Sequence, residues 1–312
     1  MKRRLAILLA LALGLSGCAF SSASPTSEQT AAAQAKQPVT LEVVTSYGGD
    51  DGSRRVFEAA VAAYEAATGN KVKDGSAVSN EGWKAKVLAD FETGSEPDVL
   101  FFFTNADADP IINAGRVVSI EDIREVYPDY ASNMKQSMLA QAVDGKHYAV
   151  PAAGYWENLF VNKSVLEACG IPVPGADYTW EQFLADCETI KGRGYIPIAC
   201  SLVEVPHYLF EFAVMNNGTV ENHLEVPTLD ENGNLRDDEV SRKWVAALND
   251  IKALYDLGYF PPNTLTATDE ETVSLFGNGK AAFLVDGSWQ VGHLGERFGD
   301  KIENMAVRFV PG

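Results

Sequence analysis

Cys18 is the first side chain whose surroundings predict a definite chemistry. It follows a basic stretch at 2–4 and an apolar run at 5–15, and it closes the sequence Leu-Ser-Gly-Cys. This order predicts a secretory signal, because the apolar run is shorter than the roughly 20 residues that span a bilayer. The ending resembles a lipobox, in which the thiol is acylated and the chain is cut before the cysteine. An ordinary secretory signal with a chance cysteine is the alternative.

Three further cysteines offer a disulfide or a thiol, and they are Cys169, Cys187 and Cys200. Export permits disulfides, and Cys187 with Cys200 is the candidate pair. An odd number of thiols nevertheless favours buried free cysteines. The spacings do not match a zinc site, which uses close cysteine or histidine pairs. We therefore expect neither a metal nor a cofactor.

Paired carboxylates are the other chemistry that so acidic a chain offers. A glycosidase holds two carboxyl groups about 5–5.5 or 6.5–9.5 Å apart, and Asp51 with Glu204 is one of many pairs that could face each other. No Gly-x-Ser-x-Gly elbow, His-Glu-x-x-His motif or Walker loop occurs in the sequence. We expect no enzyme, and a secreted carbohydrate-active hydrolase remains an alternative.

The charge balance excludes one class of partner. The 312 residues carry 43 acidic and 25 basic side chains, which gives a formal net charge of −18. Such a surface repels phosphate backbones, so we expect no nucleic-acid partner. The charge does not exclude a single cationic ligand, although solubility explains most of it.

The elements that must position these side chains follow an α/β order. Residues 19–38 are rich in Ser, Ala, Thr and Gln and predict a disordered tether. From residue 39 the pattern predicts a first group of strands and helices, with strands at 39–44, 70–73 and 97–103 and helices at 53–69 and 79–94. The apolar strand at 97–103 is typical of a parallel sheet covered on both faces.

A second α/β group follows residue 150. A capping box at Thr179 and Gln182 begins a helix that runs to residue 190. Further helices are predicted at 163–169, 207–216 and 238–257, and strands at 196–200 and 281–285. Trp83, Trp180 and Trp244 have core spacing on helices. Two α/β lobes place a ligand where strand ends meet between them.

Four segments give this chain a resemblance to a known family. They read LEVVTSYGGDDGSRRVFEAAVAAYEAATGNKV, then FETGSEPDVLFFF, then YAVPAAGYWENLFVNKSVLEACGI with TWEQFLADCETIKGRGYIPIA, and last FGNGKAAFLVDGSW. Their order behind a lipobox resembles the extracellular solute-binding proteins of ABC importers, in the sugar-type group that includes maltose-binding protein. The resemblance runs from about residue 39 to the end.

The resemblance implies a two-lobe periplasmic-binding-protein-like fold of type II, with a cleft between lobes that each contain a mixed sheet. The expected division is signal peptide 1–17, lipidated Cys18 and tether 18–38, N-terminal lobe 39–149 and C-terminal lobe 150–304. Residues 305–312 would begin a return hinge strand. Family members continue further, so the resemblance implies a fragment or a truncated gene.

Aromatic faces that stack on sugar rings and planar polar groups that bind hydroxyls define the expected site. By the resemblance, Trp289 matches the stacking tryptophan and Tyr155 and Trp156 follow a crossover strand. The remaining positions that the resemblance places at the ligand are Asp50, Asp51, Phe103, Asn105, Asn158, Glu204 and His207.

These features together predict an extracytoplasmic lipoprotein of an ABC importer. It would capture a mono- or oligosaccharide between two lobes and deliver it to the permease subunits, while acylated Cys18 holds it on the outer face of the cell membrane. The alternative from another class is a ligand-sensing surface receptor.

Overall fold

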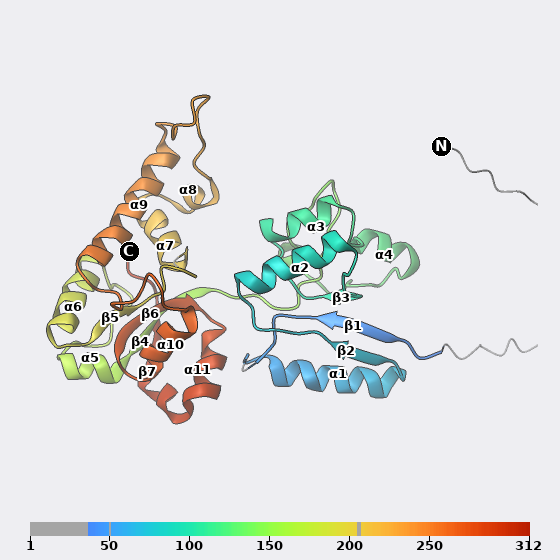
Figure 1. Ribbon diagram of the computed structural model, residues 1–312, viewed down its shortest axis with the longest axis horizontal. Helices are drawn as coiled ribbons and strands as arrows, with labels where there is room; N and C mark the ends of the chain where they lie inside the picture. The colour runs from blue at the N-terminus through green and yellow to red at the C-terminus, as the bar shows by residue number, and fades with distance from the viewer. Residues whose placement is uncertain (1–36, 50, 205–206) are drawn as a thin grey trace, which may run out of the picture. The chain divides into compact units, whose positions relative to one another are not determined.

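The computed structural model describes residues 37–49, 51–204 and 207–312. These residues form two β-sheets, each flanked by helices (Figure 1). The predicted signal peptide, Cys18 and most of the predicted tether lie outside the described residues, as does Asp50. No helix among the residues that can be described combines the length and apolar character that a membrane crossing requires.

The first sheet contains three parallel strands in the order β2-β1-β3. In chain order its elements are β1 (Thr40–Val44), α1 (Arg54–Thr68), β2 (Lys71–Asp74), α2 (Glu81–Thr93) and β3 (Val99–Leu100). Short helical segments follow at η1 (Ala106–Ala108), α3 (Asp109–Asn113), α4 (Ile120–Val126) and η2 (Gln136–Met138). The predicted strand–helix alternation is therefore present, and α1 packs against β2 (Figure 1).

The strand predicted at 97–103 is wrong in length, because β3 contains only two residues. Phe101 still donates its N–H to the carbonyl of Val44 at 2.9 Å, but the chain then leaves the sheet. The Phe102 and Phe103 rings pack on Trp83 of α2, at centroid distances of 5.4 and 6.3 Å. The apolar run therefore fills a helix–sheet interface instead of extending the strand.

Helix α2 confirms its predicted core face and corrects its predicted start. Trp83, Val87 and Phe91 are all buried on one side of it. The residue that caps the helix is Asn80, not the predicted Ser79, because the Asn80 side chain accepts the N–H of Trp83 at 2.8 Å. Such a cap stabilises a helix by about 1 kcal/mol.

The second sheet is mixed and has the order β5-β6-β4-β7. Its strands are β4 (Glu157–Asn162), β5 (Ile196–Ala199), β6 (Ala281–Gly287) and β7 (Met305–Arg308). Its helical elements are α5 (Lys163–Cys169), α6 (Trp180–Gly192), α7 (His207–Asn217), α8 (Val220–Leu224), α9 (Glu239–Asp256), α10 (Asp269–Gly277), α11 (Gln290–Phe298) and η3 (Gly299–Asn304). Strand β4 pairs antiparallel with both β6 and β7, whereas β5 and β6 are parallel.

Strand β6 is buried along its whole length, because helices cover both faces of the second sheet. One face packs in a cluster that includes Leu159, Phe183 and Phe283, and the other face carries Phe160, Phe276 and Leu294. The predicted capping box at Thr179 and Gln182 is present. The antiparallel pairing holds the end of β6 and the start of β4 side by side.

The three cysteines of the described chain are buried free thiols: Cys169, Cys187 and Cys200. The candidate disulfide between Cys187 and Cys200 is therefore not formed. Cys187 lies in the apolar cluster on α6, which explains why its thiol needs no partner.

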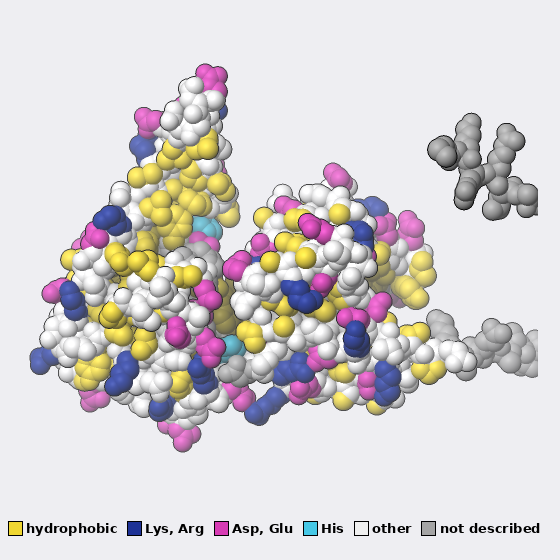
Figure 2. Space-filling model, viewed as in Figure 1, with side chains coloured by type: hydrophobic (Ala, Val, Ile, Leu, Met, Phe, Trp, Pro, Cys, Tyr) yellow, Lys and Arg dark blue, Asp and Glu magenta, His cyan; other side chains and the backbone are white. Residues whose placement is uncertain are grey.

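Exposed apolar side chains gather on the projecting elements α8 and α9 and on the loop between them, where Figure 2 shows a hydrophobic surface. Those more than two-fifths exposed are Val220, Leu224, Val226, Leu229, Leu235, Val245, Leu248 and Tyr255.

Candidate functional site

Three aromatic rings meet where β6 ends, and we call Tyr155, Trp289 and Tyr208 the aromatic cluster. The Tyr155 and Trp289 centroids lie 4.9 Å apart in an edge-on arrangement. The Tyr208 and Trp289 centroids lie 5.5 Å apart. Edge-on and tilted pairs of this kind stabilise each other, so the cluster has a defined shape. Two of its members, Tyr155 and Trp289, are residues that the sequence placed at the ligand.

Backbone pairing between β4 and β6 fixes this arrangement. Glu157 lies opposite Gly287 in the antiparallel ladder. Beyond the strands, Ser288 donates its N–H to the carbonyl of Trp156 at 2.8 Å, and the Trp156 N–H reaches Ser288 Oγ at 3.4 Å. Tyr155 and Trp156 remain 54% and 67% exposed, so their rings present apolar area to a ligand.

Gly287 makes room for the indole of Trp289. A β-carbon built at Gly287 would overlap the six-membered ring of that side chain. The indole therefore lies directly over the backbone at the end of β6, a position that only a glycine allows.

Carboxyl groups surround the aromatic cluster, and we call Glu157, Glu204, Glu211, Asp269 and Asp286 the carboxyl cluster. Asp286 is 1% exposed, and its carboxyl accepts the N–H of Gly287 at 2.6 Å and the amide of Gln290 at 2.7 Å. Burial, with the added charge of Asp269, raises its pKa well above the ordinary value. The carboxyl of Asp286 is therefore harder to ionise than an exposed aspartate.

The pKa of Glu157 is raised by similar surroundings. Burial and the neighbouring Glu211 raise the pKa of Glu157 to about 7. Burial also raises the pKa of Tyr208, and the charges of Asp286, Asp269 and Glu157 raise it further. Three carboxyl groups from three elements therefore lie near the Tyr208 ring, and Glu211 lies near Glu157 and Tyr155. Sequence reasoning missed Glu157, Glu211, Asp269 and Asp286.

Glu204, which the sequence placed at the ligand, bonds to the start of α10. Its carboxylate accepts the N–H of Asp269 at 2.6 Å. Burial and the charge of Glu204 raise the pKa of Asp269. Asn158 lies opposite Asp286 in the ladder, and its amide donates to the carbonyl of Trp156 at 3.3 Å. Glu204 therefore bonds to α10 from the loop before α7, and Asn158 bonds from β4 to the backbone of Trp156.

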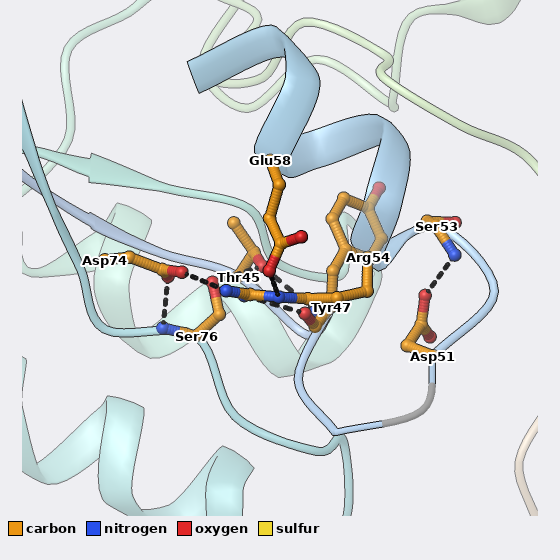
Figure 3. Close-up of polar contacts among 8 residues, drawn as sticks. All are labelled: Thr45, Tyr47, Asp51, Ser53, Arg54, Glu58, Asp74 and Ser76. Carbon is orange, nitrogen blue, oxygen red and sulfur yellow. Dashed lines mark hydrogen bonds and ion pairs between the residues drawn. The ribbon is translucent and has the colours of Figure 1, made fainter. Parts of the chain in front are cut away.

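Asp51 lies in the turn between β1 and α1. Figure 3 shows its carboxylate accepting the N–H of Ser53 at 2.7 Å. Arg54 follows on α1 and bonds to Asp74 at 2.6 Å and to Glu58 at 2.8 Å (Figure 3). Asp51 therefore shapes the turn, while one carboxylate oxygen lies 3.9 Å from His293 Nε2 on α11.

Phe103 and Asn105 have local roles in the first group of elements. The Phe103 ring packs edge-on against Trp83, and the Lys84 ammonium lies 5.1 Å from its centroid. Asn105 caps η1 by accepting the N–H of Asp107 at 3.1 Å. Of the other expected residues, Asp50 and the side chain of His207 lie outside the described residues.

The turn before α1 also touches α11. A β-carbon at Gly292 would lie 2.9 Å from the Cα of Gly52, so the two backbones meet at a pair of glycines. Beside them, Arg55 and Glu296 form an ion pair at 2.8 Å. This contact links segments more than two hundred residues apart in sequence and carries His293 toward Asp51.

These residues form a candidate site with a defined chemical character. The site offers flat apolar faces and many acceptor oxygens. The described residues contain no group of three or more His, Cys, Asp or Glu side chains arranged to hold a metal ion. Faces and acceptors of this kind suit a polar ring compound with hydroxyl or amino donors.

Comparison with known proteins identifies the family. A model of the bacterial extracellular solute-binding proteins matches residues 59–311. A search of curated proteins found no match.

Solved structures share the fold at low sequence identity. A chitin oligosaccharide binding protein superposes with a TM-score of 0.73 at 22% identity, over 88% of this chain and 67% of that one. The GacH receptor of Streptomyces glaucescens gives 0.68 at 21% identity, over 89% and 68%. MalE3 of T. maritima gives 0.67 at 16% identity, over 88% and 67%. The mixed α/β fold is therefore that of the two-lobe binding proteins, and the family match over residues 59–311 shows that this chain belongs to the bacterial extracellular solute-binding proteins.

Proposed function

We propose that this protein is the sugar receptor of an ABC importer. It captures a mono- or oligosaccharide and delivers it to the permease subunits, and it performs no catalysis. The observation that carries the proposal is the aromatic cluster with acceptor oxygens beside it, because sugars are bound by stacking on their C–H faces and by paired hydroxyl contacts.

The solved relatives support a carbohydrate ligand. One is described as binding chitin oligosaccharide, one was solved with acarbose, and one is maltose-bound. In this proposal residues 39–149 and 150–304 are two lobes, residues 305–312 begin the return strand, and the ligand lies between the lobes. Ligand binding favours the closed form, which the permease recognises.

A second part of the proposal concerns location. Acylated Cys18 holds the protein on the outer face of the cell membrane, and residues 19–38 tether the binding domain. Intact-mass measurement of protein extracted from membranes tests this, because the proposal requires acyl chains on Cys18. Unmodified Cys18 in membrane-extracted protein would refute it.

Calorimetric titration with mono- and oligosaccharides tests the receptor function. We expect saturable binding of at least one sugar, and we expect Trp289→Ala to weaken it about tenfold or more, which is about 1.4 kcal/mol. Tyr255→Ala is the control, because Tyr255 is an exposed aromatic residue on α9, outside the aromatic cluster. No saturable binding by any sugar, with the protein folded, contradicts the function, and unchanged affinity in Trp289→Ala removes this residue from the site.

A further inference from the structure

The carboxyl cluster lacks basic partners. None of its five members forms an ion pair with a lysine or arginine in the part of the chain that the structure describes. Glu211 has the one recorded ion-pair partner, His223 at 3.4 Å. His293 contributes the one favourable charge near Asp269. Structural carboxylates elsewhere in the chain do have such partners, for example Asp74 with Arg54.

Four elements and a loop bring these groups together beside Tyr155 and Tyr208 of the aromatic cluster. Glu157 enters from β4, Glu211 from α7, Asp269 from α10 and Asp286 from β6. Glu204 comes from the loop before α7 and contacts the backbone of Asp269. The convergence is a product of the tertiary fold, because these residues span about 130 positions of sequence.

A second observation points to a missing donor. Gln290 is 3% exposed, and its amide nitrogen bonds to Asp286, so its carboxamide lies at the carboxyl cluster. Its oxygen has no hydrogen-bond partner among the described residues. A buried acceptor left unpaired is costly, and a donor introduced beside Asp286 would relieve that cost.

The site therefore has a surplus of acceptors and of negative charge. Burial and neighbouring carboxylates raise the pKa values of Glu157 and Asp286, and no lysine or arginine among the described residues pairs with either group to offset this. A ligand ammonium supplies three N–H donors and one positive charge. The faces of Trp289 and the tyrosines attract a cation as well.

We infer that the sugar taken by this site carries a protonated amine, whose ammonium lies between the aromatic cluster and the carboxyl cluster with Glu157 as its main partner. This inference rests on the proposed receptor function and names its substrate class: amino sugars with a free amine. N-acetylation of that amine removes both the charge and two of its donors, so the acetylated sugar is the matched poor ligand.

Calorimetric titration of the purified protein with the glucosamine trisaccharide and the N-acetylglucosamine trisaccharide tests the inference. The pH is kept low enough to protonate the amine. We expect the free-amine trisaccharide to bind about tenfold tighter or more, and Glu157→Gln to abolish most of that preference. Glu167→Gln, an exposed position on α5, is the matched control and keeps the preference. Thermal unfolding of each variant verifies that it is folded.

Other outcomes overturn the inference in distinguishable ways. Equal or tighter binding of the acetylated trisaccharide refutes it, as does an unchanged preference in Glu157→Gln. If neither trisaccharide binds while maltotriose does, the amine inference fails and the receptor function stands. If no sugar binds to the folded protein, the receptor function fails together with the inference.

Discussion

The contact between Gly287 and the Trp289 indole gives a prediction that requires no ligand. Gly287→Ala would place a methyl group inside the volume of the indole ring. The ring must leave its place over the backbone and lose its contacts with Tyr155 and Tyr208. Overpacking of this kind costs about 1–3 kcal/mol.

The assay is thermal or urea unfolding of four proteins that form a double-mutant cycle. They are the parent, Gly287→Ala, Trp289→Ala and the double variant. In the parent background we expect Gly287→Ala to lower the melting temperature, by about 2–4 °C for each kcal/mol in a domain of this size. In the Trp289→Ala background the methyl group meets no ring, so we expect the cost to disappear. The coupling energy between the two positions should therefore equal most of the single-mutant cost.

Gly295 supplies a control on the neighbouring helix α11. A β-carbon there would lie 3.7 Å from Ile302 Cδ1, which is ordinary contact distance. Gly295→Ala should therefore stabilise the protein by about 0.5–1 kcal/mol, the usual gain for alanine over glycine inside a helix. If Gly287→Ala were neutral, or equally costly without the Trp289 ring, the steric argument would be refuted.

Three further predictions follow from the same structure. First, the pKa of Glu157 rises from 4.5 to about 7 on folding, so the native state holds a proton that the unfolded chain releases. Stability should therefore fall as the pH rises through that interval, and urea titrations should show a smaller fall in Glu157→Gln. Second, the buried thiols should react with a thiol reagent only on unfolding, and mass mapping of the labelled protein under native conditions would contradict this if it found label at Cys169, Cys187 or Cys200. Third, Gly292→Ala places a methyl group 2.9 Å from the Cα of Gly52, so hydrogen exchange at residues 52–55 should become faster, whereas unchanged exchange would show that the contact tolerates the methyl group.

The sequence predicted α1, α2, α5, α6, α7 and α9, because their signals are local, and it missed α3, α4, α8, α10 and α11. The capping box at Thr179 and the apolar face of α2 are complete within a few residues. The strand at 97–103 failed because its apolar run suits a strand and an aromatic core segment equally. Only the position of Trp83 decides between them, and that position depends on how α2 packs.

The family resemblance brought Trp289 and Tyr155 into the expected site, and their role at a ligand stays a prediction. The structure corrects one detail, because Tyr155 and Trp156 precede β4 and do not follow a strand. Glu157 and Asp286 become neighbours through the register of β4 against β6, which no local pattern specifies. A carboxyl group at the end of an apolar run, as in Leu-Val-Asp-Gly-Ser-Trp, was the one available signal for Asp286.

The hydrogen bonds that continue the β4–β6 pairing past the strands have a consequence for the thermodynamics of recognition. They tie the backbones of Trp156 and Ser288 together, so the two chain segments that carry the aromatic rings form one unit before any ligand arrives. Little conformational entropy then remains to be lost on binding. We expect ligand association with these two segments to be limited by the displacement of water and by the fit of the ligand ring. We also expect the segments to discriminate between ligands by shape.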